Sequence, residues 1–227
     1  MREESRSTAP GRVRYRPAGP DDAGSVARLH ADSRRRHYRG AYADAYLDGD
    51  ILTDRRAVWS ARLAAAAGTA TLPAGTATLP ATATLLATAT LLAEDDTGPV
   101  GFVHVVFDDD RWGSLVDNLH VAPGRQRAGI GTGLLARAAA AVVEHAAGTT
   151  MYLWVLEQNT AAQAFYRALG GTRVPRTATA SPGPTRQGLS AVCCIDTLDW
   201  LQLAGLWSRR IPGGNRCASW RKVSSRY

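Results

Sequence analysis

The sequence has few of the residues that mark disulfide-linked, zinc-binding or membrane-spanning proteins. It contains 3 cysteines among 227 residues, all late in the chain: Cys193, Cys194 and Cys217. Adjacent cysteines do not suit a disulfide framework, and no Cys-x-x-Cys or histidine spacing indicates zinc, so we expect no metal. No run approaches the roughly 18 consecutive apolar residues of a membrane span, and the N-terminal residues lack the apolar segment of a secretory signal. We therefore expect no membrane partner and a cytoplasmic location.

Lysine is nearly absent, since Lys222 is the only one, yet the formal net charge is +7. A basic protein invites the hypothesis of a nucleic-acid partner. The charge is unevenly distributed: residues 1–173 hold 19 Lys/Arg and 18 Asp/Glu, whereas residues 174–227 hold 8 and 2. The basicity belongs to the C-terminal segment, so the pattern argues against nucleic acid as the partner of the preceding domain. A salt-sensitive DNA binder remains an alternative for the tail.

Glycine is concentrated in one informative segment, which runs from Val121 to Leu135. An apolar strand is predicted to end at Val121, and a proline turn and an Arg/Gln/Gly loop then lead into an alanine-rich helix. Glycines at positions 129, 131 and 133 let the backbone approach a ligand closely. The first turn of the helix offers unpaired N–H groups and a partial positive charge. Together these features predict a seat for an anion such as a diphosphate.

The spacing of this segment excludes two common phosphate-binding motifs. The dinucleotide pattern G-x-G-x-x-G fails because position 134 is Leu, and no acidic residue follows about 20 residues on at the end of a second strand. A P-loop fails because no Gly-Lys-Ser/Thr follows. What remains is Gln126-x-x-Gly129-x-Gly131, which resembles the acetyl-CoA signature of the Gcn5-related N-acetyltransferase (GNAT) superfamily. A glycine-rich turn without a ligand is the alternative interpretation.

A second match lies downstream of the first. Residues 151–156 are predicted to form a buried strand, followed by Glu157-Gln158-Asn159 and a short helix that contains Phe165-Tyr166. A strand ending in Asn, a helix with Phe-Tyr and a closing Leu-Gly-Phe are similar to the second half of the GNAT cofactor site. Gly171 stands where that family usually has an aromatic residue. Two motifs in the expected order strengthen the resemblance.

The resemblance implies an α/β (α+β) fold of the acyl-CoA N-acyltransferase type, with a mixed, mostly antiparallel central sheet flanked by helices. We expect a GNAT domain at 12–174, with a low-complexity repeat insertion at 68–87. The segment 175–227 is expected to be an atypical basic tail, foreign to the domain and largely disordered. The predicted strands lie at 13–16, 88–94, 99–107, 114–121, 151–156 and from 172, with a weak seventh at 191–195. The predicted helices run from 23 toward 42 and at 43–47, 54–67, 131–147 and 160–169.

The resemblance also implies acetyl-CoA as cosubstrate and a primary amine of a small molecule or peptide as acceptor. The loop and helix start are expected to hold the diphosphate through these residues: Arg125, Gln126, Arg127, Ala128, Gly129, Ile130, Gly131, Thr132 and Gly133. The main chains of Leu119 and Val121 should pair with the pantetheine arm like an added strand. Asn159 matches the family residue that hydrogen-bonds the arm or an active-site water.

Transfer to an amine requires a base, an oxyanion donor and an acid for the leaving thiolate. Tyr166 occupies the position of the family acid, although a tyrosine that only packs on the cofactor is the alternative. For the base, Asp117 on the strand before the loop is favoured over His120 and Glu157. Strand alternation should place Asp117 and His120 on opposite faces unless a bulge intervenes. On the early helices, the aromatic segment 37–42 either faces substrate or packs the helical pair, through His37, Tyr38 and Tyr42.

A different class of function stays open beside the enzyme. A non-catalytic acyl-CoA-binding regulatory module would retain the diphosphate seat without turnover. The lack of a clear seventh strand favours this alternative, because GNAT acceptor sites use that end of the sheet. The identity of the amine and the oligomeric state, with a homodimer as one option, do not follow from the sequence.

Overall fold

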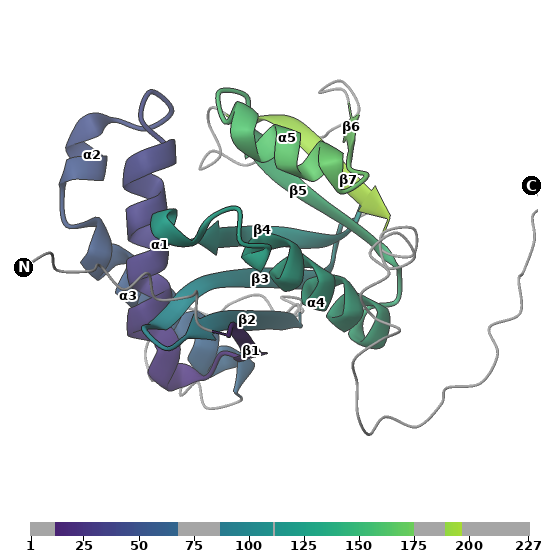
Figure 1. Ribbon diagram of the computed structural model, residues 1–227, viewed down its shortest axis with the longest axis horizontal. Helices are drawn as coiled ribbons and strands as arrows, with labels where there is room; N and C mark the ends of the chain where they lie inside the picture. Colours follow the sequence, from purple (N-terminus) through teal and green to yellow (C-terminus); the bar gives the residue numbers. More distant parts are fainter. Residues whose placement is uncertain (1–11, 68–86, 111, 175–188, 197–227) are drawn as a thin grey trace, which may run out of the picture.

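The central sheet of the computed structural model is mixed and mostly antiparallel, as the sequence predicts (Figure 1). The structure describes residues 12–67, 87–110, 112–174 and 189–196. Within them the strands follow the order β1-β2-β3-β4-β5-β7-β6, and only β4 and β5 run parallel. Their bounds are Arg14–Pro17 (β1), Thr88–Asp95 (β2), Gly98–Asp110 (β3), Gly113–Val121 (β4), Thr150–Leu156 (β5), Thr172–Val174 (β6) and Leu189–Asp196 (β7).

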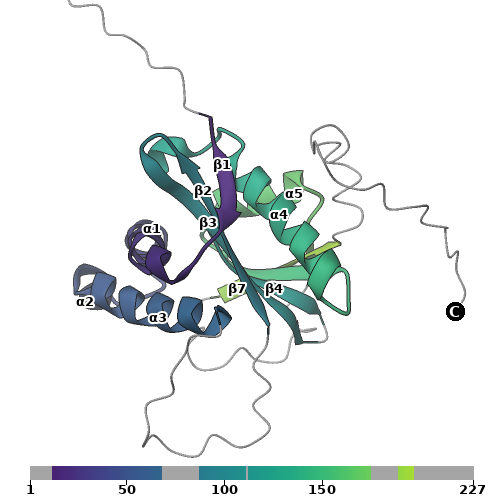
Figure 2. The same ribbon diagram turned by 90° about the horizontal axis from the view of Figure 1, so that it is seen from below.

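Helices cover both faces of the sheet (Figure 2). One face carries α1, α2 and α3, and the other carries α4 and α5. Their bounds are Ala23–His37 (α1), Asp44–Asp48 (α2), Ile51–Ala66 (α3), Ile130–His145 (α4) and Thr160–Ala168 (α5). Helix α3 begins three residues before the predicted start because Asp50 caps it, accepting a hydrogen bond from the Thr53 N–H at 3.1 Å.

Each helical layer buries an apolar stripe of the kind that a 3.6-residue period produces. In α4 the buried residues repeat every three or four positions and pack on the sheet; they are Ile130, Leu134, Leu135, Ala138, Ala139 and Val142. On the opposite face, Trp59 and Leu63 of α3 pack with Val26 of α1 against Phe102 of β3. The sheet is therefore the shared wall of two hydrophobic cores.

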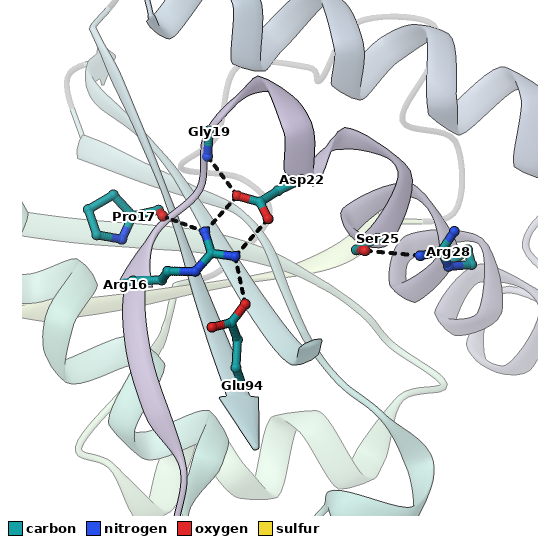
Figure 3. A network of polar contacts seen from close by, with 7 residues as sticks. All are labelled: Arg16, Pro17, Gly19, Asp22, Ser25, Arg28 and Glu94. Carbon is teal, nitrogen blue, oxygen red and sulfur yellow. Dashed lines mark hydrogen bonds and ion pairs between the residues drawn. The ribbon is translucent and has the colours of Figure 1, made fainter. Parts of the chain in front are cut away.

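The Arg16 side chain links β1 to the start of α1 and to β2 (Figure 3). Its guanidinium binds both carboxylate oxygens of Asp22, at 2.7 and 2.8 Å, and Glu94 Oε1 at 2.6 Å. Asp22 is the residue before α1, as predicted, but its side chain does not cap the helix. It accepts from the Gly19 N–H instead, and the Arg16 contact lowers the pKa of Asp22. The predicted start of α1 is therefore confirmed, but the Asp22 carboxylate binds Arg16 and the Gly19 N–H and does not cap the helix.

Two irregularities in β4 shape the centre of the sheet. First, Val105 pairs with Val116 while His104 pairs with Asn118, so Asp117 is an extra residue, a β-bulge. Second, β4 and β5 pair only at their first residues, at Ser114–Met151 and Leu115–Tyr152. Beyond these pairs the two strands diverge, as Figure 1 shows. The second half of β4 therefore has an edge that β5 does not cover.

The weakly predicted seventh strand is present. Strand β7 lies between β5 and β6 and pairs antiparallel with both. These eight residues fall within the segment that the sequence assigns to the tail, so the sheet draws on that segment. The rest of the tail, at 175–188 and 197–227, and residues 68–86 of the repeat lie outside the described residues. No helix in the described part of the chain is long and apolar enough to cross a membrane.

Candidate functional site

The uncovered edge of β4 presents main-chain hydrogen-bonding groups. Ala122 N–H donates to Val100 O at 2.8 Å, which fixes the phase of the antiparallel ladder with β3. The direction of the main-chain hydrogen bonds alternates along such a ladder. The N–H and C=O groups of His120 therefore point to β3, whereas those of Leu119 and Val121 point to the other edge of β4. That edge is where β5 has diverged. The two residues expected to pair with a pantetheine arm thus have their main chains aimed at the opening.

The start of α4 lies directly after this edge and forms the expected anion seat. Gly129 is the residue before the helix and has φ +77°. The Gly133 N–H donates to Gly129 O at 2.9 Å, so the amides of the three preceding residues have no acceptor within the helix. A Cβ built on Gly129 would meet no heavy atom within 4 Å, which shows that the backbone is open to the outside here.

The three glycines of the motif have three different roles. Gly129 adopts a left-handed conformation that glycine favours. A Cβ on Gly131 would lie 3.3 Å from the ring of Phe165, so this position allows α4 to approach α5 closely. A Cβ on Gly133 would lie 2.2 Å from the Tyr15 hydroxyl, and its amide already donates to Gly129. Gly133 therefore serves packing, and its amide is not available to a phosphate as the sequence suggested.

The two arginines of the loop also differ. Arg125 Nη2 pairs with Asp95 Oδ2 at 2.9 Å, and the Asp95 side chain is only 2% exposed. Hydrogen bonds from Thr97, with the charge of Arg125 in support, lower the pKa of Asp95. This pair ties the loop to the β2–β3 turn. Arg127 is exposed and has φ +63°, and no ion pair of its guanidinium is found among the described residues. Arg127 is therefore the better candidate to reach a phosphate.

The second motif lies beside the first, on α5. Asn159 caps this helix: its Oδ1 accepts from the Ala162 N–H at 3.1 Å. The cap uses one lone pair of the carboxamide oxygen, so the Nδ2 group is left as a donor for a ligand. Tyr166 is 8% exposed and packs edge-on against Phe165, with 5.2 Å between ring centroids. Because Phe165 contacts Gly131, Tyr166 lies on the helix that adjoins the start of α4.

On the other face of the sheet, the bulge reorients Asp117. Its Oδ2 accepts from Arg62 Nη1 of α3 at 2.7 Å and from Asn118 Nδ2 at 2.8 Å. His120 contacts Phe102 on this same face, with 5.2 Å between ring centroids. Asp117 and His120 therefore point to the same face, which is the exception that the sequence analysis allowed for a bulge, because the extra residue shifts the alternation. Glu157, the third candidate base, is exposed and lies 3.9 Å from Arg173.

Two buried histidines, His30 and His104, and the half-buried His120 line this face around Trp59. Trp59 Nε1 donates to His30 Nδ1 at 3.0 Å, and the His30 ring stacks on His120 at 5.1 Å. Burial lowers the pKa of His120 to about 3 and that of His104 to about 4, with nearby arginines adding to both shifts. The pKa of His30 is lowered further by burial and by His120. All three imidazoles are neutral near pH 7.

Arginine and tyrosine side chains surround the outer end of this histidine cluster. Arg34 Nε lies 2.9 Å from His30 Nε2, and its guanidinium lies 5.5 Å from the ring centroids of both Tyr38 and Tyr42. Both tyrosines pack on Ala31, Leu47 and Ile51. Sequence analysis singled out the two tyrosines but missed His30 and Arg34. His30, Arg34 and Tyr38 follow one another at intervals of four residues, along α1 and just past its end. This spacing is the signal that would have placed all three on one helix face.

One contact joins the two sides of the opening. Gln158 Nε2, in the turn between β5 and α5, donates to the Arg39 carbonyl at 2.6 Å in the turn between α1 and α2. The aromatic segment of the early helices is thereby held next to the end of β5. The cofactor edge, the Asp117 bulge and the Arg34 cluster thus belong to one region of the molecule.

The comparisons agree with this architecture. Residues 66–170 match the model of the Acetyltransferase (GNAT) family. Over this segment the chain is similar to the GNAT family. A PaiA N-acetyltransferase from Thermoplasma acidophilum, solved with coenzyme A, is similar at 16% identity and TM-score 0.60, covering 82% of this chain and 99% of that one. YncA from Salmonella typhimurium, a putative acetyltransferase solved with acetyl-CoA, is similar at 17% identity and TM-score 0.53, covering 91% and 99%.

A GNAT-family acetyltransferase from Staphylococcus aureus Mu50 is also similar, at 15% identity and TM-score 0.57, with 82% of this chain and 99% of that chain covered. At such identities the likeness concerns the fold. No curated protein sequence matches the chain. In the described residues no group of three or more His, Cys, Asp or Glu side chains could hold a metal ion. The predicted fold and family resemblance are confirmed.

Proposed function

We propose that this protein is an N-acetyltransferase that moves the acetyl group of acetyl-CoA to a primary amine of a small molecule or peptide. One observation carries the proposal: the uncovered edge of β4 leads directly into the free amides at the start of α4. Acetyl-CoA has an arm with two amide groups, which suits a strand edge, and a diphosphate, which suits a helix start. The GNAT match and the neighbours solved with coenzyme A or acetyl-CoA support the same ligand.

The binding roles follow from the positions of these groups. The main chains of Leu119 and Val121 bind the pantetheine arm, and the Nδ2 group of Asn159 adds a donor at its side. The main-chain amides of 126–132 surround the diphosphate, with the strongest contribution from the start of α4, whereas the Arg125 amide already donates to Ala122 O at 2.8 Å. The exposed Arg127 guanidinium forms charge-assisted hydrogen bonds to phosphate oxygens. Arg125 positions the loop through Asp95.

The chemical step needs three proton transfers. The Asp117 carboxylate takes a proton from the acceptor ammonium, which leaves a nucleophilic amine. As the amine attacks the thioester carbonyl, an N–H group of the β4 edge stabilises the oxyanion. The Tyr166 hydroxyl protonates the sulfur while the C–S bond breaks, and the second proton of the attacking nitrogen restores the tyrosine. The products are the N-acetylated amine and coenzyme A, and Asp117 releases its proton to solvent. Arg62 holds the Asp117 carboxylate in place through a hydrogen bond at 2.7 Å.

The structure removes the observation that favoured a non-catalytic module. That alternative depended on the weak sequence signal for a seventh strand. Strand β7 lies between β5 and β6, on the side of β5 away from β4. Its presence supports a domain with an acceptor site over the non-catalytic module.

Two measurements test the proposal. Calorimetry should detect acetyl-CoA binding, and thiol release should accompany turnover with at least one member of an amine panel. Tyr166→Phe and Asp117→Asn should reduce kcat by about 100-fold or more while acetyl-CoA affinity changes little, because each removes one proton-transfer group. Binding without turnover on any amine would support the regulatory module instead. Absence of binding would refute both.

A further inference from the structure

We infer that the acceptor amine carries a carboxylate, and that Arg34 and His30 bind it. The inference rests on the proposed acetyl transfer and adds the chemical class of the acceptor. It comes from an arginine that no carboxylate contacts directly, a histidine placed between two donors, and the position of both beside His120 at the end of β4.

Arg34 has no carboxylate in ion-pair contact among the described residues; this is also true of Arg28, but Arg28 is exposed, whereas Arg34 is half-buried among aromatic side chains. On the same helical layer Arg39, Arg55 and Arg62 each form an ion pair with an aspartate. Among the described residues no carboxylate lies within 4.0 Å of the Arg34 guanidinium. This half-buried cation is held in place by uncharged groups instead, namely His30 and three tyrosines: Tyr38, Tyr42 and Tyr46. Tyr46 in turn donates to Asp54, so this carboxylate is linked to Arg34 only through the tyrosine. A fixed guanidinium without a direct carboxylate contact is a receptor suited to a carboxylate.

The contacts of His30 point to the same ligand. Trp59 directs its indole N–H at Nδ1, and Arg34 directs its Nε–H at Nε2. A neutral imidazole has one acceptor nitrogen and one N–H group, so it cannot accept both hydrogen bonds. Trp59 is fully buried and its N–H is rigidly placed, which makes Nδ1 the acceptor. Nε2 then carries the proton and faces the Arg34 donor, and a carboxylate oxygen that displaced Arg34 slightly would accept from both.

The position of this pair links it to the reaction. The His30 ring stacks on His120 of β4, whose Nε2 is buried without a partner. On its other side His30 contacts Trp59, and Arg62 lies over the Trp59 ring at 5.2 Å while binding Asp117. The carboxylate site and the proposed base therefore lie within one layer of packed side chains. In an amino acid or a short acidic peptide, the amine and the carboxylate also lie close to each other.

Matched acceptors test the inference and separate the two sources of a carboxylate. Tyrosine against tyramine tests the α-carboxylate of a free amino acid. The peptides Gly-Glu-Ala and Gly-Gln-Ala, both with an amidated C-terminus, are compared to test a side-chain carboxylate. Initial rates of thiol release give kcat/KM for each compound. We expect the carboxylate member of one pair to be preferred by about 10- to 100-fold, the range of a charged hydrogen-bonded contact.

Variants then assign that preference to Arg34. Arg34→Gln should remove the preference while leaving kcat/KM for the uncharged partner within about twofold, and Arg34→Lys should retain part of it. Arg28→Gln is the matched control, because Arg28 lies on the same helix, is exposed and bonds only Ser25 in the described structure. Equal rates within both pairs, or a preference that survives Arg34→Gln, would overturn the inference.

A binding measurement distinguishes this result from failure of the proposed reaction. Protein saturated with coenzyme A is titrated calorimetrically with N-acetylglycine and with N-methylacetamide, which lacks only the carboxylate. Binding of N-acetylglycine alone, lost in Arg34→Gln, supports the carboxylate site even if no amine is turned over. Equal binding of both compounds, or no effect of Arg34→Gln, contradicts it.

Discussion

Replacing Gly129 by Asp or by Asn tests the diphosphate seat with two variants of nearly equal shape. Gly129 has φ +77°, and a Cβ there would meet nothing within 4 Å. Asparagine and aspartate are the residues that best tolerate this left-handed conformation. Both variants therefore incur a similar conformational cost and no steric clash. They differ by one negative charge at the place where we expect phosphates.

The size of the effect follows from Coulomb's law. The side chain at position 129 is exposed, so an effective dielectric constant of about 40 is reasonable. At about 6 Å, one pair of unit charges then repels by about 1.4 kcal/mol, and the two charges of a diphosphate by about 3 kcal/mol. Salt screening reduces this value. Gly129→Asp should therefore bind acetyl-CoA about 10- to 100-fold more weakly than Gly129→Asn.

Calorimetric titration with acetyl-CoA at low and at high salt measures this difference. The gap between the two variants should narrow as salt increases, since the site is open to solvent. Thermal unfolding of both variants checks that they are equally stable. Equal affinities of the Asp and Asn variants for acetyl-CoA would show that the diphosphate does not lie at the start of α4, and the proposed cofactor position would be wrong.

Three further predictions concern the rest of the domain. The free energy of unfolding should fall as pH drops from 6.5 toward 4, by up to about 1.4 kcal/mol per pH unit for His104, because its pKa of about 4 in the folded protein lies below the unfolded value of 6.5. His104→Gln should flatten that slope in urea titrations at pH 7 and 5, and an unchanged slope would contradict a neutral buried His104. Gly133→Ala should destabilise the fold by about 1–3 kcal/mol, because its methyl group collides with Tyr15, and a raised Tm would refute this packing. Arg62→Gln should lower kcat/KM by about 10-fold, because Asp117 loses the charged hydrogen bond that positions it, and unchanged kinetics would separate Asp117 from catalysis.

Local patterns in the sequence predicted the order of the elements and the start of the cofactor site. Strand and helix periodicity located β4, α4 and β5, because each buries a regular apolar stripe. The loop at 125–131 was recognisable because positive φ and free helix amides depend on residues that are adjacent in the chain. Even the weak strand at 191–195 was placed correctly, since β-branched and apolar residues are concentrated there.

The tertiary structure alone decided which side chains share a site. The bulge at Asp117 depends on the pairing of β4 with β3, a long-range register that the alternating pattern of one strand does not contain. Likewise, Asp95 forms an ion pair with Arg125, and Tyr15 leaves no room for a side chain at Gly133. Both contacts join segments that are distant in the sequence. The placement of Arg34 beside His30 and His120 requires α1 to pack on the sheet. Sequence periodicity reports which face of an element is buried, whereas the packing of elements determines what that face meets.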